Sequence, residues 1–266
     1  MDMTSYDKDL FKGTAGFYSQ YRPIYPSSLI RLLIDRFELD GKGKMLDLGC
    51  GTGQLTLRLS DWFEKLIGVD PEEEMLVEAE RNRIAARVDH CEWLAGKAEH
   101  YLNGINNEAF RLVMMAKSFH WMDQEAILEG LYTLIDGGGG IAIIDAYNPN
   151  QKSEPWQLEL NRVVRNWYGE ERKAGSTTYS HPAMSYEERV SRSRFKAEVV
   201  KLPAYQYVWS ADSIIGNVYS TSYGSRRWIG EQREAYETEL REALLNIHPN
   251  DSFVEEIQLT VVLGLK

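Results

Sequence analysis

Three glycines at alternate positions, in the stretch MLDLGCGTGQLTLRLS at residues 45–60, constrain this chain more than any other feature. They are Gly49, Gly51 and Gly53. The apolar run before them predicts a buried strand, and the leucine spacing after them predicts a helix. Glycine adopts positive φ angles and lets the backbone approach a ligand closely, while the start of the next helix offers free N–H groups at the same place. The stretch therefore predicts a strand, a tight turn and a helix around a ligand.

The first half of the chain continues to alternate between apolar strands and helical segments. We expect strands at 44–48, 66–70, 88–95, 110–116 and 141–145. We expect helices at 28–37, at 55–63, after Pro71 and at 123–135, the last of them stopped by the glycine run 136–140. Such alternation is typical of an α/β fold with a doubly wound parallel sheet, whose strands are apolar because both faces are covered.

The composition narrows the partners of the protein. Of 266 residues, 43% are hydrophobic and 26% are charged, and the formal net charge is −10. An acidic surface disfavours nucleic acid, and no apolar run is long enough to span a membrane. Two cysteines and a polar N-terminus without a signal-peptide pattern fit a reducing compartment. We therefore expect a cytoplasmic protein that binds neither nucleic acid nor membrane.

The acid before the glycines distinguishes this turn from a dinucleotide-binding turn. The dinucleotide fingerprint requires a third glycine at the position where this chain has Gln54. Asp47, at the end of the first strand, would repel a pyrophosphate and attract a cation or a hydroxyl, or it would simply cap the turn. The turn thus predicts a nucleoside ligand with a positive group rather than a nicotinamide dinucleotide.

The segment LDLGCGTG at 46–53 resembles motif I of the class I S-adenosylmethionine-dependent methyltransferases. Four further features are similar, in order and spacing, to the small-molecule, type 11-like branch: YRPIYP at 21–26, Asp70 after the second strand, GKAEH at 96–100 and AKSFHWMD at 116–123. The resemblance covers about residues 17–145. It implies a Rossmann-like, doubly wound, mostly parallel seven-stranded sheet with the last strand antiparallel, plus a mainly helical lid. It also implies S-adenosylmethionine as cofactor and S-adenosylhomocysteine as product.

This resemblance suggests four parts. We expect a strap and helix over the cofactor site at 1–40, the cofactor-binding core at 41–150, a helical lid or substrate-binding insertion at 151–246 with one core strand near 196–209, and the C-terminal strand of the core sheet at 247–266. The aromatic residues of the lid either line a pocket or fill a helical core; among them are Trp156, Trp209, Tyr219 and Tyr223.

The resemblance also assigns roles to residues near the turn. Asp70 would accept hydrogen bonds from both ribose hydroxyls, although it could equally cap the helix after Pro71. Asp47 would lie near the amino group of the methionine moiety, and Arg22 would pair with its carboxylate. The expected cofactor-binding residues are Tyr21, Arg22, Asp47, Gly49, Cys50, Gly51, Gly53, Asp70, Pro71, Met75, Ala98, Glu99, Ala116 and Lys117.

His120, Tyr18 and Tyr21 are the expected catalytic residues. His120 follows the fourth strand, where an imidazole would take a proton from the nucleophile near neutral pH, or would only hydrogen-bond a loop. Tyr18 or Tyr21 would place a ring or hydroxyl near the sulfonium, unless the N-terminal segment is merely structural. The histidines lack ligand spacing, so we expect no metal site.

The expected function is methyl transfer to an oxygen or nitrogen of a small-molecule acceptor, such as a carboxylate-bearing molecule or a natural product. The chain lacks the N/D-P-P-Y motif after the fourth strand, which argues against nucleobase amines as acceptors. A cofactor-binding regulatory protein without transferase activity and a nicotinamide-dependent oxidoreductase remain as alternatives. We expect a monomer or a homodimer.

Overall fold

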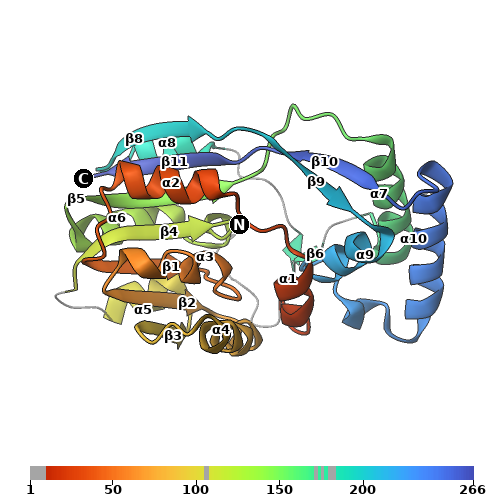
Figure 1. Cartoon of the computed structure of the whole chain (residues 1–266), viewed down its shortest axis with the longest axis horizontal. Helices are drawn as coiled ribbons and strands as arrows, with labels where there is room; N and C mark the ends of the chain where they lie inside the picture. The colour runs from red at the N-terminus through yellow and green to blue at the C-terminus, as the bar shows by residue number, and fades with distance from the viewer. Residues whose placement is uncertain (1–9, 105–107, 171–172, 175–176, 179–183) are drawn as a thin grey trace.

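The computed structural model describes residues 10–104, 108–170, 173–174, 177–178 and 184–266. Its layout has two parts, a core sheet flanked by helices and a lid built mostly from helices (Figure 1). Both chain halves contribute to the core, because the last strand returns from the lid into the sheet.

The core sheet has seven strands in the order β3-β2-β1-β4-β5-β11-β8. These strands are β1 Lys44–Leu48, β2 Lys65–Asp70, β3 Cys91–Ala95, β4 Phe110–Ala116, β5 Ile135–Asp145, β8 Lys196–Lys201 and β11 Thr260–Leu265. Strands β3, β2, β1, β4 and β5 pair in parallel, and β11 runs antiparallel to both of its neighbours. The doubly wound, mostly parallel sheet with an antiparallel last strand is therefore confirmed.

Strand order reverses at β1, which pairs with β2 on one side and β4 on the other. In open α/β sheets, ligands bind beside the carboxyl ends of the strands at such a switch point. The glycine turn that follows β1 lies at this point.

Helices cover both faces of the sheet and bury two hydrophobic clusters. On one face, Leu29 and Leu33 of α2 pack with Leu112 and Met114 of β4. On the other face, α6 packs against the alternate residues of the same strand. The helices around the core are α2 Ser27–Arg36, α3 Gln54–Leu57, η1 Ser60–Trp62, α4 Glu73–Ala86, α5 Ala98–Gly104, η2 Phe119–Trp121, α6 Gln124–Leu134 and α8 Tyr186–Ser191.

Two local expectations for the core are wrong. Helix α6 ends at Leu134, as expected, but the glycine run at 136–140 belongs to β5, so this strand starts at Ile135 and not at 141. Within the run, Gly140 leaves no room for a side chain, because a Cβ there would lie 2.4 Å from the carbonyl oxygen of Gly264. The helix expected over 55–63 is divided into α3 and η1.

The lid consists of helices and a small sheet around a third hydrophobic cluster. Its elements are α1 Ala15–Tyr21, α7 Pro155–Tyr168, β6 Lys173–Ala174, β7 Thr177–Thr178, β9 Tyr205–Trp209, α9 Ala211–Tyr219, η3 Arg226–Trp228, η4 Gly230–Gln232, α10 Arg233–Ile247 and β10 Phe253–Ile257. Trp156, Trp209 and Tyr219 belong to this cluster and fill the core of the lid, where Trp156 and Trp209 also border a cavity. Tyr223, by contrast, lines the cavity at the sheet edge that is described below.

The stretch at 196–209 contains the one expected core strand, which is β8, and also a strand that was not expected, β9, which belongs to the lid sheet. Pro203 separates them, and proline cannot donate to a strand ladder. Strand β9 then pairs with β10, which begins at Phe253. The C-terminal segment expected to contribute only a core strand therefore also supplies half of the lid sheet.

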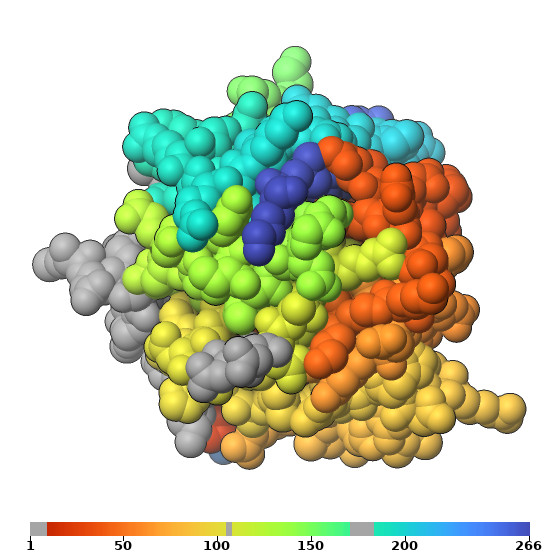
Figure 2. All heavy atoms as spheres, turned by 90° about the vertical axis from the view of Figure 1, so that its left-hand side faces the viewer, coloured from red at the N-terminus to blue at the C-terminus, as the bar shows by residue number. Residues whose placement is uncertain are grey.

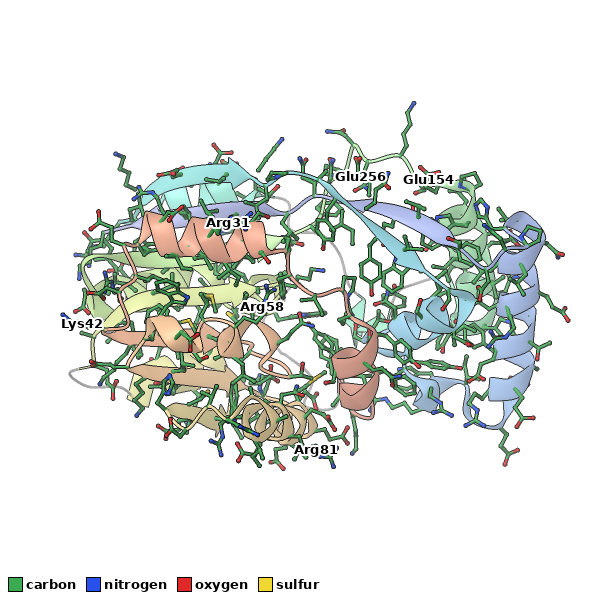
Figure 3. The ribbon with its side chains drawn as sticks, viewed as in Figure 1. Arg31, Lys42, Arg58, Arg81, Glu154 and Glu256 are labelled. Carbon is green, nitrogen blue, oxygen red and sulfur yellow. The ribbon has the colours of Figure 1, made fainter. Side chains whose placement is uncertain are left out.

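Most charged side chains lie on the surface of the protein, outside the hydrophobic clusters. Charged side chains such as Arg31, Lys42 and Arg81 project outward from the core, and Glu154 and Glu256 lie at the edge of the lid (Figure 3). Seen from the end of the sheet, the blue C-terminal residues emerge between the red-orange N-terminal helix and the cyan segment that contains β8 (Figure 2). Within the described part of the chain, no helix combines the length and apolarity needed to cross a bilayer.

Gly68→Ala is expected to destabilise the core. A Cβ at Gly68 would lie 2.4 Å from the Trp93 ring and 2.9 Å from Cys50 Sγ. Overpacking of this kind costs about 1–3 kcal/mol, which urea unfolding would measure as a lower free energy of unfolding. Gly130→Ala in α6 is the matched control, since its nearest neighbour would be 3.6 Å away, and alanine in a helix stabilises by up to about 1 kcal/mol. Equal stabilities for the two variants would contradict the packing described for β2.

Candidate functional site

A cavity of about 390 Å³ lies at the carboxyl ends of the central strands. Segments from the ends of β2, β3, β4 and β5 line it, α1 contributes from one side, and residues 221–223 of the lid close it from another. Twelve of the expected site residues line the cavity: Tyr18, Arg22, Gly49, Gly51, Asp70, Pro71, Met75, Ala98, Glu99, Ala116, Lys117 and His120. The structure thus gathers residues that are up to about a hundred positions apart in sequence.

The glycine turn is tethered to the neighbouring strand. The main-chain N–H groups of Gly49 and Cys50 both donate to the carbonyl oxygen of Val69, at 2.8 and 3.1 Å. Gly49 and Gly51 have φ angles of +73° and +55°, and a Cβ at Gly49 would lie only 2.4 Å from Ser118 Cβ. Only glycine fits at that position, because both the backbone angle and the space exclude a side chain.

Asp70 bridges the turn and the helix after β2. Its Oδ2 accepts from the Gly51 N–H at 2.8 Å, and its Oδ1 accepts from the Glu72 N–H at 2.9 Å. Burial raises the pKa of this carboxyl to about 6, while the two main-chain donors act in the opposite direction. Each oxygen can accept a further hydrogen bond, and the residue lines the cavity, so Asp70 can hold two adjacent hydroxyls.

Asp47 is a buried carboxyl with one free acceptor. Thr56 Oγ1 donates to Asp47 Oδ2 at 2.6 Å, whereas Oδ1 is buried and has no hydrogen-bond partner among the described residues. Burial raises the pKa of Asp47 to about 7. The residue lines a second, smaller cavity of about 30 Å³, which shares Tyr18, Arg22 and Lys117 with the first. A cationic group placed there would satisfy the free oxygen and favour the charged carboxylate.

Arg22 and Tyr18 form a pair at the edge of α1. The Arg22 guanidinium lies 4.9 Å from the centroid of the Tyr18 ring, and Arg22 Nη2 donates to the carbonyl oxygen of Ser220 at 3.2 Å. Arg22 Nε is buried and has no hydrogen-bond partner within the described ranges. The Arg22 guanidinium, a planar fork of N–H groups, therefore still has an N–H donor that can bind an anion in the cavity.

Besides Asp47, three expected residues lie outside the larger cavity. Tyr21 stacks near Phe17, with 6.2 Å between ring centroids, and faces Gly216 of α9, where a Cβ would be 2.3 Å from its ring. Cys50 is buried and lines only the smaller cavity, and Gly53 packs against Trp93. Tyr21 therefore anchors α1 to α9 within the lid, because the helix period directs positions 18 and 22 to the cavity and 17 and 21 to α9.

His120 lies in η2, directly after β4, and lines the cavity beside Trp121, with 4.7 Å between the ring centroids. The sequence prediction missed Asp145, Ser118 and Ser222. Asp145 ends β5 as Asp70 ends β2, so its position at a strand end was a usable signal. Ser222 had none, because only the folded lid brings it to the cavity.

The switch point at β1, the antiparallel last strand and the acid-flanked turn resemble those of the class I S-adenosylmethionine-dependent methyltransferases. More particularly, residues 45–139 match the family described as the methyltransferase domain. The cofactor of the class is S-adenosylmethionine.

Known relatives cover part of the chain, and similar structures cover most of it. The probable S-adenosylmethionine-dependent methyltransferase CRG1 of Saccharomyces cerevisiae is 29% identical over 142 residues, which are 53% of this chain and 48% of that protein. An uncharacterized methyltransferase of Mycobacterium bovis is 27% identical over 154 residues, 58% of each chain. This chain thus spans about half of the length of the relatives that it matches.

Two solved structures share the fold across nearly the whole chain. A putative type II methyltransferase from Anaeromyxobacter dehalogenans has a TM-score of 0.58 and 21% identity, covering 92% of this chain and 96% of its own. The YcgJ protein of Bacillus subtilis has a TM-score of 0.56 and 16% identity, covering 90% and 98%.

Asp47→Asn is expected to flatten the dependence of stability on pH. The folded state binds the Asp47 proton more tightly, with a pKa near 7 against an ordinary value of 3.8, so the free energy of unfolding falls as the pH rises between these values. Asparagine does not ionise, so between about pH 5 and about pH 8 the free energy of unfolding of the variant should fall by about 2–3 kcal/mol less than that of the parent.

Urea unfolding at several pH values measures this difference. The exposed Asp136→Asn serves as the control and should follow the parent curve. Parallel curves for Asp47→Asn and the parent would mean that the Asp47 carboxyl is not desolvated as described. The slope that remains in the variant comes in part from Asp70, whose pKa is also raised.

Proposed function

We propose that this protein transfers the methyl group of S-adenosylmethionine to an oxygen or nitrogen of a small-molecule acceptor. The observation that supports this most is the grouping of Asp70, the free Oδ1 of Asp47 and the Arg22 fork around one glycine turn. A zwitterionic nucleoside needs such a set: acceptors for hydroxyls, an acceptor for an ammonium, and a donor fork for a carboxylate.

The residues present fit this cofactor. Asp70 would hold the ribose hydroxyls, Asp47 the amino group and Arg22 the carboxylate of the methionine moiety. Apolar and small residues beside Asp70 would enclose the adenine; these are Pro71, Met75 and Ala98, next to Glu99. A pyrophosphate fits less well, because the two buried carboxyls at the turn would repel it.

When bound, the cofactor supplies a methyl group already activated by a sulfonium charge. The protein then has to orient the acceptor, exclude water and manage a proton. The Tyr18 ring lies over the turn, 3.7 Å from where a Gly51 Cβ would be, and residues 221–223 cover the opposite side. An imidazole nitrogen of His120 would accept the proton of a hydroxyl or amine nucleophile.

Asp70→Asn is expected to weaken binding of S-adenosylhomocysteine about 30-fold to 100-fold. The variant loses a charged acceptor and gains a donor, which costs about 2–3 kcal/mol for a hydrogen-bonded charge. Isothermal titration calorimetry measures the affinity, and the exposed Asp61→Asn is the control. An unchanged affinity in a folded Asp70→Asn protein would remove this residue from the cofactor site.

His120→Ala is expected to reduce kcat about 100-fold to 10,000-fold while the affinity for S-adenosylhomocysteine stays within about threefold. A general base takes a proton from the acceptor and does not contact the cofactor, so kcat should fall while the affinity for S-adenosylhomocysteine stays nearly constant. His100→Ala, an exposed site outside the cavity lining, should behave as the parent. Full turnover in His120→Ala would exclude this residue as the base, and cofactor binding without transfer to any acceptor would favour a regulatory role.

A further inference from the structure

Lys117 brings a cation into the cavity without a carboxylate beside it. The residue follows β4, lines both cavities and is only partly exposed. Across the described ranges, its side chain makes no hydrogen bond and no ion pair. Burial, together with the nearby Arg22 charge, lowers the pKa of Lys117 to about 8. The charged surface lysine Lys42 at the outer edge of the core offers a contrast (Figure 3).

The backbone of Lys117 is held in an unusual conformation at the edge of the cavity. Its φ angle is +55°, a left-handed conformation that non-glycine residues adopt at a cost of about 1–2 kcal/mol. Its N–H donates to the carbonyl oxygen of Ile144 at 2.9 Å, which fixes the end of β4 against β5. Strain of this kind persists where the surrounding structure enforces it, and it clusters at functional sites.

Two carboxylates, those of Asp145 and Glu255, attract the Lys117 ammonium electrostatically, but both accept hydrogen bonds from other groups. Asp145 Oδ1 accepts from the main-chain N–H groups of Ala146 and Tyr147, at 2.7 and 3.1 Å. Glu255 of β10 accepts from Trp209 Nε1 at 2.8 Å and from Gln157 Nε2 at 3.3 Å. Both attract the ammonium from a distance and neither pairs with it.

The cofactor supplies no ion-pair partner for Lys117. Bound S-adenosylmethionine would bring one carboxylate, for which Arg22 provides the fork, while Asp70 and Asp47 would bind its hydroxyls and its ammonium. Asp145 also lines the cavity but does not pair with Lys117, so the Lys117 ammonium would lack an ion-pair partner unless another anion enters. The remaining molecule that enters this cavity is the acceptor.

We propose that the acceptor is an organic acid and that one of its carboxylates forms an ion pair with Lys117. This inference rests on the proposed methyl transfer and adds the class of acceptor to it. Lys117 is then a specificity-determining residue, which selects acids over their neutral analogues. Ser222 lines the same cavity and offers its hydroxyl group to an oxygen that the ammonium does not reach, whereas the Ser118 hydroxyl already donates to the carbonyl oxygen of Leu48 at 2.6 Å.

The test compares acids with their amides on the parent protein and on Lys117→Met. Succinate, glutarate, 4-hydroxybenzoate and 4-hydroxycinnamate have a second nucleophilic oxygen besides the carboxylate that would pair with Lys117. Each acid, beside its amide, would be titrated into the protein–S-adenosylhomocysteine complex and then assayed as an acceptor. We expect at least one acid to bind and its amide to bind about 30-fold more weakly, since an unpaired buried charge remains. In Lys117→Met, the Kd and KM of that acid should rise about 30-fold, and Lys117→Arg should restore most of the loss.

The controls separate the two proposals. Lys42→Met, at the surface, should leave every value unchanged. If S-adenosylhomocysteine binds neither the parent nor the variants, the proposed function fails. If it binds and no acid is preferred over its amide, or if Lys117→Met leaves acid binding unchanged, the proposed function stands and this inference is overturned. A loss of S-adenosylhomocysteine affinity in Lys117→Met would assign Lys117 to the cofactor and also overturn it.

Discussion

The hydrogen bond from the Gly51 N–H to Asp70 Oδ2 joins the turn after β1 to the end of β2, and the site depends on it. A buried carboxylate is costly, and Asp70 offsets this cost by accepting from two main-chain donors. Those donors fix the orientation of the carboxylate, which therefore faces the cavity before any ligand arrives. The same bond restrains the turn, so that Gly49 and Gly51 hold the positive φ angles that open the space beside them.

Helix α1 lies between this turn and helix α9, and each of its two sides contacts one of them. Tyr18 and Arg22 face the cavity, and Phe17 and Tyr21 pack on α9 through Tyr219 and Gly216. Arg22 also donates to the carbonyl oxygen of Ser220, at the end of α9. A displacement of α9 would therefore move Arg22, to which we assign the carboxylate of the methionine moiety, but not Asp47, which lies in core strand β1.

Local pattern predicted the parts of the site that follow directly from a strand. Asp47, Asp70, Ala116 and Lys117 lie at strand ends, and parallel strands bring such positions to one edge of the sheet. Tyr21 was placed on the wrong side, because no helix was expected at 15–21 and the helix period alone separates it from Tyr18. The glycine run in β5 was misread, since its close approach to Gly264 of β11 has no signal in the local sequence.

The sequence by itself determined the alternation of strands and helices that is typical of a doubly wound sheet, and the acid-flanked turn, because apolar periodicity and glycine spacing act within a few residues. The strand order, with its reversal at β1, came from the tertiary structure. Only the tertiary structure decided that β10 leaves the core to pair with β9, that Tyr21 anchors the lid, and that Ser222 reaches the cavity. It also decided that neither Asp145 nor Glu255 pairs with Lys117, since Asp145 accepts from the main-chain N–H groups of the two residues after it and Glu255 accepts from Trp209 and Gln157. Contacts between distant segments depend on how whole elements pack, and no short stretch of sequence encodes that packing.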